Sequence, residues 1–155
     1  MADLCSAFRE YLVSVKKASP NTVESYMRDI HQYSEYCASN GGDTETADSA
    51  LIKKYVEYLS GKGKSDATVS RTVASVRCYY RFLISKNIIE ENPVNGIKLK
   101  KAEKKLPGIL DSNEIILLLS QPDGDDYKSV RDKAMLELLY ATGIRVSELT
   151  ELTVS

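Results

Sequence analysis

Apolar residues recur at helical spacing along almost the whole chain, and this periodicity limits the fold more than any other feature. In the first such stretch, residues 3–17, the side chains of Leu4, Phe8, Leu12 and Val15 follow the repeat of an α-helix. No stretch shows the alternation of apolar and polar residues that marks a strand or a hairpin. The sequence therefore predicts an all-α fold for these residues.

Capping signals divide the pattern into helices. Ser19, Asp48 and Ser65 each stand just before an apolar-periodic stretch, where a short polar side chain can accept a hydrogen bond from a free backbone N–H. Pro20 follows Ser19 at the preferred first helical position. We expect helices over residues 3–17, from Pro20 to Asn40-Gly41-Gly42, from Asp48 to Gly61, from Ser65 to about Lys86, after Asp111 or Ser112, over about 127–142 with Gly143 closing the helix, and from near Val146.

The segment IKLKKAEKKLP, residues 97–107, interrupts this pattern. It is rich in lysine, has no clear period and leads into Pro107-Gly108, which is typical of an interdomain linker. We therefore expect a helical domain over residues 1–97, a basic linker over 98–107 and the beginning of a second domain over 108–155.

Composition excludes several classes of protein. Hydrophobic residues make up 43% and charged residues 28% of the 155 residues, which is typical of a globular chain. The longest apolar run, Ile115 to Leu119, is far too short to cross a membrane, and the N-terminus does not resemble a signal peptide. Three scattered cysteines and one histidine, His31, offer no metal-ligand spacing. We expect no metal, no cofactor and a cytoplasmic location.

Charge is segregated along the chain although the formal net charge is only −1. Residues 62–86 hold six basic residues and one acid, and residues 98–105 hold five lysines and one glutamate. Residues 106–155 hold four basic and nine acidic residues. Segregation of this kind favours electrostatic steering toward a polyanion such as nucleic acid.

The helix expected from Ser65 has an apolar face and an opposite basic face. At 100° per residue the apolar face holds Val69, Val73, Val76, Tyr80, Leu83 and Ile84. The opposite face has no acid of its own, and most of its other residues are small, including Ala74, Ser75 and Cys78. Small residues allow close approach to a DNA groove, and basic side chains bind phosphates or base edges. The predicted DNA contacts on this helix are Lys64, Thr68, Arg71, Arg77 and Arg81.

Two further segments are candidate DNA contacts. The N-terminal half of the helix that begins at Pro20 carries Asn21, Thr22 and Arg28, although Glu24 and Asp29 dilute the positive charge there. The linker supplies the lysines that would follow the DNA backbone, namely Lys98, Lys100, Lys101, Lys104 and Lys105.

Several motifs together resemble one family over essentially the whole chain. Residues 140–149 read YATGIRVSEL and are preceded by VRDKAMLELL; SPNTVESYMRDI begins at Ser19, and ENP precedes the basic linker. These segments resemble the tyrosine recombinases of the phage-integrase family, specifically the Xer type. The resemblance implies a SAM-like helical core-binding domain followed by the first helices of an α+β catalytic domain. It leaves open whether the biological role is chromosome-dimer resolution or mobile-element movement.

The same resemblance implies an activity and a site. Family members cut DNA through a 3′-phosphotyrosine intermediate and act as tetramers of recombinase protomers on duplex DNA. The arginine of the ATG-hydrophobic-R motif holds the scissile phosphate, and Arg145 occupies that position here. A guanidinium fork suits the charge that develops on phosphate oxygens, and Glu148 on the same helical face can hold that guanidinium. Gly143 supplies the tight turn before Arg145.

The family's other catalytic groups lie downstream of this motif, and the 155 residues end at Ser155. We therefore expect a fragment that binds DNA but does not cleave it. Its apolar residues in 108–155 would need cover, by dimerisation, by exchange between chains or by local disorder. The alternative is an all-helical protein-interaction module that never binds nucleic acid. Periodicity places Tyr11, Tyr26, Tyr33, Tyr55, Tyr80 and Tyr140 at core or half-buried positions, and Val130, Ala134, Leu138 and Leu139 on an inward face.

Overall fold

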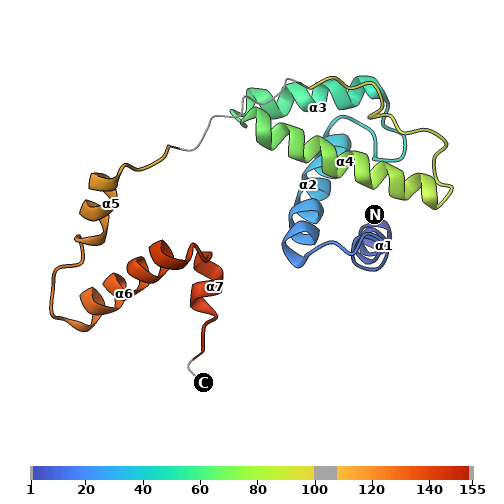
Figure 1. Ribbon diagram of the computed structural model, residues 1–155. Helices are drawn as coiled ribbons and strands as arrows, with labels where there is room; N and C mark the ends of the chain where they lie inside the picture. Colours follow the sequence, from blue (N-terminus) through green and yellow to red (C-terminus); the bar gives the residue numbers. More distant parts are fainter. Residues whose placement is uncertain (1, 100–107, 154–155) are drawn as a thin grey trace. The chain divides into compact units, whose positions relative to one another are not determined.

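The computed structural model describes residues 2–99 and 108–153, and all regular structure among them is helical (Figure 1). This confirms the all-α prediction. The helices are α1 (Ala2–Ser14), α2 (Pro20–Ser39), α3 (Ser49–Gly61), α4 (Asp66–Ser85), α5 (Ser112–Leu119), α6 (Tyr127–Thr142) and α7 (Val146–Thr150). None of the helices in the described ranges is long and apolar enough to cross a bilayer.

The predicted caps begin these helices. Ser19, Asp48 and Ser65 accept hydrogen bonds from the backbone N–H three residues ahead, at 3.3, 2.8 and 3.2 Å. Of the two candidates before α5, Asp111 is the N-cap. The side chain of Glu114 accepts a hydrogen bond from the backbone N–H of Asp111 at 2.8 Å. These local bonds satisfy N–H groups that have no partner inside the helix.

The first helix is shorter than predicted. It ends at Ser14, and Lys17 adopts a positive φ of 49°. The backbone N–H of Ala18 then reaches back to the carbonyl oxygen of Leu12 at 3.0 Å. This turn redirects the chain toward the Ser19 cap, so residues 15–17 cannot continue the helix.

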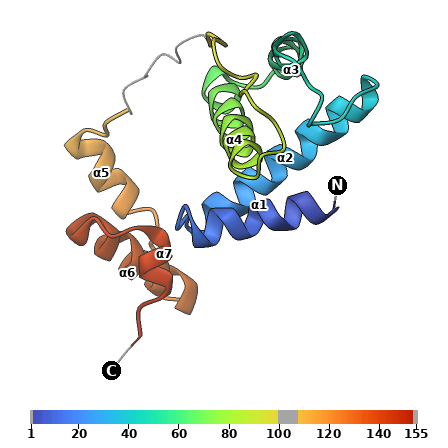
Figure 2. The ribbon, with the colours of Figure 1, turned by 90° about the vertical axis from the view of Figure 1, so that its right-hand side faces the viewer.

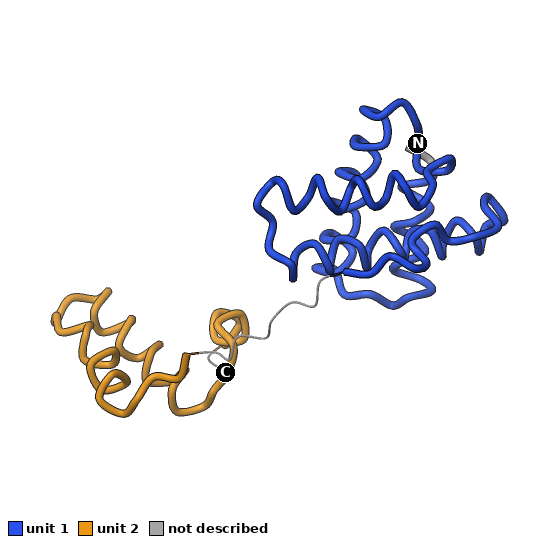
Figure 3. Tube along the Cα trace, turned by 90° about the horizontal axis from the view of Figure 1, so that it is seen from above, with its two compact units in different colours: residues 1–104 blue, residues 105–155 orange. Residues whose placement is uncertain are grey.

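The chain divides into two compact units, residues 1–104 and residues 105–155 (Figure 3). Leu99, in the segment predicted to be linker, still packs against the core of the first unit. Lys98 is exposed beside it. The packed part of the first unit therefore extends past residue 97.

The core of the first unit lies between α2 and α4, with α3 and α1 on opposite sides of that pair (Figures 1 and 2). The predicted apolar face of α4 is buried, except that Ile84 is half-buried. Tyr33 and Tyr80 meet inside the core through their hydroxyls at 2.7 Å, and the Tyr80 hydroxyl also donates to the carbonyl oxygen of Thr44 at 2.9 Å. Burial raises the pKa of both phenols.

One residue of α4 is not where the helical wheel placed it. The wheel predicts Ser75 on the outer face, but Ser75 is buried, and so is its neighbour Thr72. The reason is that α2 crosses α4 closely enough to cover the edge of the outer face as well as the apolar face. The buried surface of α4 is therefore wider than its apolar arc.

The second unit contains α5, α6 and α7, and none of its described residues is buried. The predictions that Val130, Ala134 and Leu138 point inward, and that Tyr140 is half-buried, are wrong for this unit because all four side chains are exposed. Three short helices bury too little area to enclose a core. An open apolar cavity of about 460 Å³ lies between α5 and α6.

Candidate nucleic-acid interface

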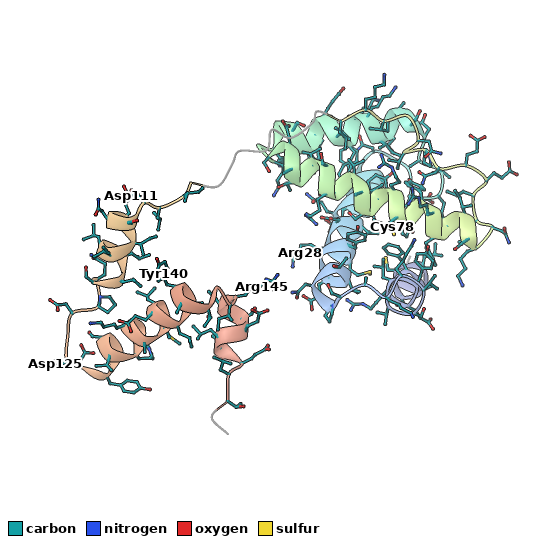
Figure 4. The ribbon with its side chains drawn as sticks, viewed as in Figure 1. Arg28, Cys78, Asp111, Asp125, Tyr140 and Arg145 are labelled. Atoms are coloured by element: carbon teal, nitrogen blue, oxygen red, sulfur yellow. The ribbon has the colours of Figure 1, made fainter. Side chains whose placement is uncertain are left out.

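The outer surface of α4 carries basic side chains along its length. Lys64, Arg71 and Arg81 are exposed and Arg77 is half-buried. From α2, Arg28 is exposed and lies beside this surface, as shown by the cleft that it lines together with Lys64 and Arg71. We call the surface formed by Lys64, Thr68, Arg71, Arg77 and Arg81 the basic face. Figure 4 shows Arg28 projecting outward from α2.

Arg71 is held by a carboxylate from α2. Its two terminal nitrogens donate to the two oxygens of Asp29 at 2.6 and 3.0 Å, in a fork. The hydroxyls of Ser75 and Thr72 also donate to Asp29, at 2.7 and 3.4 Å. The Asp29 side chain is 5% exposed and the Arg71 side chain 47% exposed. The sequence predicts that Asp29 reduces the positive charge of the α2 surface, but the carboxylate is buried and paired with Arg71 inside the protein.

A small cleft lies next to this ion pair. It has a volume of about 160 Å³. Its polar lining comes from both helices and from the turn before α4, and Asp29 is the one acid among its lining residues. We call it the Arg71 cleft, and it is lined by Arg28, Asp29, Gln32, Leu59, Lys64, Thr68, Val69, Arg71 and Thr72.

A second cleft, of about 340 Å³, lies toward the other end of α4 and has no acidic lining residue. Three of its lining residues are cationic, Lys16, Arg77 and Arg81. Sequence reasoning missed Lys16, which the turn after α1 brings to this place; the adjacent Lys17 was the available signal. We call it the Arg81 cleft, and its other lining residues are Leu12, Ala18, Thr22, Tyr26, Ala74 and Cys78.

Cys78 lies at this second cleft, on α4 (Figure 4). Burial raises the pKa of its thiol, and the charges of Lys16 and Arg81 offset part of that rise. The thiol is therefore a small neutral group beside cations at neutral pH. Among the described residues no cluster of His, Cys, Asp and Glu could hold a metal ion.

The remaining predicted contacts differ in what they offer. Asn21 is exposed at the start of α2. The hydroxyls of Thr22 and Thr68 lie 2.9 Å from the cap hydroxyls of Ser19 and Ser65, so part of their bonding capacity serves the helix ends. Lys100, Lys101, Lys104 and Lys105 lie outside the described residues.

Another cavity of the first unit has the opposite character. It measures about 710 Å³ and is lined by four carboxylates, Glu45, Asp48, Glu90 and Glu91. It shares no lining residue with the two basic clefts. Four carboxylates repel phosphate groups, so this cavity does not suit a polyanion.

In the second unit, Arg145 stands at the N-cap of α7. Gly143 before it has a φ of 66°, as predicted for the residue that ends α6. Glu148 accepts from the Arg145 backbone N–H at 2.8 Å and from its guanidinium at 3.0 Å. The Arg145 side chain is 83% exposed, so most of its donors are open to a ligand.

Comparison with known proteins covers both units. Residues 6–87 match the family described as phage integrase, N-terminal SAM-like domain, and residues 109–155 match the phage integrase family. The protein named tyrosine recombinase XerD of Oceanobacillus iheyensis is 41% identical over 151 residues, which is 96% of this chain and 50% of the relative.

Two further relatives agree. The protein named tyrosine recombinase XerD of Halalkalibacterium halodurans is 39% identical over 88% of this chain and 46% of its own length. The protein named tyrosine recombinase XerC of Pelobacter propionicus is 35% identical over 96% of this chain and 50% of its own length. The chain thus spans about half the length of the curated relatives that it matches.

Proposed function

The chain belongs to the phage integrase family of tyrosine recombinases, and from this premise we propose that its first unit binds duplex DNA through the basic face of α4. One observation supports the proposal most directly. Two clefts flank this face, each lined by three cations, and Asp29, the one acid among their lining residues, is neutralised by Arg71. Such a surface matches the phosphates on the two sides of a DNA groove that receives a helix.

Arg145 is the proposed ligand of the scissile phosphate in the second unit. Its guanidinium offers donors that can bind two phosphate oxygens at once and stabilise the charge that develops there. Glu148 holds it on one side through the bond at 3.0 Å, leaving the exposed side for the phosphate. Cleavage through a 3′-phosphotyrosine and assembly into a tetramer on DNA are the activity and the partners proposed for the whole recombinase.

The 155-residue polypeptide by itself is proposed to bind DNA without cleaving it, in the cytoplasm. We expect an affinity of about 10⁻⁴ to 10⁻⁶ M at physiological salt, the range of non-specific binding through phosphate contacts. The lysines from Lys98 to Lys105 are proposed to follow the DNA backbone. The exposed apolar side chains of the second unit, such as Ile116 and Leu117, are proposed to favour dimerisation.

The test is a titration of a fluorescent duplex of about 30 base pairs, followed by anisotropy at several salt concentrations. The test variant is Arg77→Ala/Arg81→Ala, which removes two cations of the Arg81 cleft. The matched control is Lys53→Ala/Lys54→Ala, which removes two exposed cations of α3 that line neither basic cleft. Each lost phosphate contact reduces the salt slope by about 0.9, so the test variant should lose about 2 and the control nothing.

Two outcomes contradict this function. Equal loss in the test and control variants would mean that binding depends on net charge and not on the basic face. Absence of salt-dependent binding by the wild-type chain at low salt would favour the alternative, a helical module that binds other proteins.

A further inference from the structure

We propose that Asp29 is a positioning residue for DNA binding, holding the guanidinium of Arg71 so that its free N–H groups face the phosphate backbone. This inference rests on the proposed DNA-binding function. It concerns a carboxylate, which by charge alone would oppose binding to DNA.

The geometry of Asp29 is that of a fixed support. Its two oxygens receive the two terminal nitrogens of Arg71, and the Ser75 and Thr72 hydroxyls donate to the same oxygens. All three donor residues belong to α4, whereas Asp29 belongs to α2. Because the Asp29 side chain is only 5% exposed, packing around it keeps the carboxylate in one position.

The geometry of Arg71 leaves donors for a ligand. A guanidinium carries five N–H groups, and the fork with Asp29 occupies one on each terminal nitrogen. The remaining N–H groups belong to a side chain that is 47% exposed and that lines the Arg71 cleft with Arg28 and Lys64. Because the support already fixes the rotamer, binding does not have to order this side chain.

The loss of a negative charge and the loss of positioning predict opposite changes in DNA affinity for the substitution Asp29→Asn. Asp29→Asn removes a negative charge beside the proposed DNA surface, so electrostatics alone predicts tighter binding. It also breaks the fork, because an amide offers one acceptor oxygen and places an NH₂ group against the guanidinium or the Ser75 hydroxyl. Positioning therefore predicts weaker binding in spite of the added positive charge.

The experiment compares Asp29→Asn with Glu24→Gln by DNA anisotropy at several salt concentrations. Glu24 is exposed on the same helix, so Glu24→Gln makes the same charge change without touching the fork. We expect about tenfold weaker binding for Asp29→Asn, the size of one charge-assisted contact, and equal or tighter binding for Glu24→Gln. Tighter binding by Asp29→Asn, in parallel with Glu24→Gln, would overturn the proposal.

A second background separates positioning from general loosening of the fold. In Arg71→Gln, which has no guanidinium to hold, adding Asp29→Asn should not weaken DNA binding further. An equal loss in both backgrounds would assign Asp29 a structural role only. Circular dichroism fixes a temperature at which every variant is folded. If Asp29→Asn does not fold, Asp29→Glu keeps the charge but moves the carboxylate by one methylene, and wild-type affinity in that variant would refute the proposal.

A measurement without DNA separates this inference from the proposed function. Side-chain ¹⁵N NMR of the wild-type chain should show a slowly exchanging, slowly rotating guanidinium for Arg71, and Asp29→Asn should lose that signature while Glu24→Gln keeps it. If the wild-type chain bound no DNA but showed the signature, the proposed function would fail and the support would stand. A freely rotating Arg71 in the wild-type chain would overturn the inference whatever the DNA result.

Discussion

Replacing Arg71 by alanine should destabilise the first unit markedly, although the residue lies on an exposed face. The Asp29 carboxylate is 5% exposed in the intact pair, and the substitution leaves it with only the hydroxyls of Ser75 and Thr72 as hydrogen-bond partners. Removing one partner of a fully buried ion pair costs about 3–5 kcal/mol. Because the Arg71 side chain is 47% exposed and water partly screens the pair, we expect about 2–3 kcal/mol.

The assay is urea unfolding followed by circular dichroism at 25 °C. Arg71→Ala should lower the urea concentration at the midpoint of unfolding without changing the slope of the unfolding free energy against urea concentration. The double variant Asp29→Asn/Arg71→Gln, which removes both charges, should recover most of the loss because no charge is left buried. A loss below about 0.5 kcal/mol for Arg71→Ala, or a double variant less stable than Arg71→Ala, would refute the reasoning.

This result also decides how DNA-binding variants are read. For a domain stable by about 5 kcal/mol, a loss of 3 leaves about 2 kcal/mol, so some 97% of molecules remain folded. A large fall in DNA affinity for Arg71→Ala then cannot come from unfolding. Arg77 and Arg81, which form no ion pair within the described residues, are the cleaner positions for testing the basic face.

The tyrosine core carries the remaining predictions. Tyr33→Phe removes the hydroxyl 2.7 Å from that of Tyr80 and should cost about 1 kcal/mol in urea unfolding, whereas an unchanged midpoint would contradict the importance of that bond. Tyr55→Phe should be neutral or stabilising by up to about 1 kcal/mol in the same assay, because the Tyr55 hydroxyl is buried and has no hydrogen-bond partner within the described residues; a clear loss would reveal a partner. Burial raises the pKa of Tyr33, Tyr55 and Tyr80, so the folded state holds these protons more tightly than the unfolded state does. Their contribution to the free energy of unfolding is therefore complete below the unfolded-state pKa of about 10. It is lost as the pH rises above that value, by up to about 1.4 kcal/mol per pH unit for each phenol. Absorbance at 295 nm should show that at least three of the ten tyrosines ionise only together with the loss of helical circular dichroism, and ionisation of all ten in the folded state near pH 10 would contradict the burial.

Local signals were enough to place most of the helices. Ser19, Asp48 and Ser65 act on N–H groups three residues away, so their effect is visible in a short window of sequence. Where a local signal failed, at the end of α1, the cause was also local but harder to see. Lys17 adopts a left-handed conformation that its residue type does not announce.

The support of Arg71 could not be predicted because its parts are distant in sequence. Asp29 and Arg71 are 42 residues apart, and their meeting depends on how α2 crosses α4. A helical wheel treats each helix alone, so it assigned Ser75 to an outer face that α2 in fact covers. Lys16 reached the Arg81 cleft for the same kind of reason, through a turn and a crossing.

Prediction of the second unit failed for the opposite reason. The periodicity of α6 predicts that Val130 and Leu138 lie on an apolar face, and such a face is stable when another surface covers it. The described residues of this unit include no element that covers them, so both side chains are exposed. Periodicity thus identifies an apolar face but not the element that buries it.

The buried position of Thr44 has a consequence for how the first unit forms. Thr44 lies in the loop between α2 and α3, yet its side-chain hydroxyl meets that of Tyr79 at 3.3 Å, and its carbonyl oxygen accepts from Tyr80 at 2.9 Å. These partners are 35 and 36 residues further along the chain, on α4. The α2–α3 pair therefore cannot reach its final arrangement during synthesis until α4 has left the ribosome. The loop between α2 and α3 is therefore completed only when α4, more than 30 residues further along the chain, is available to bind it.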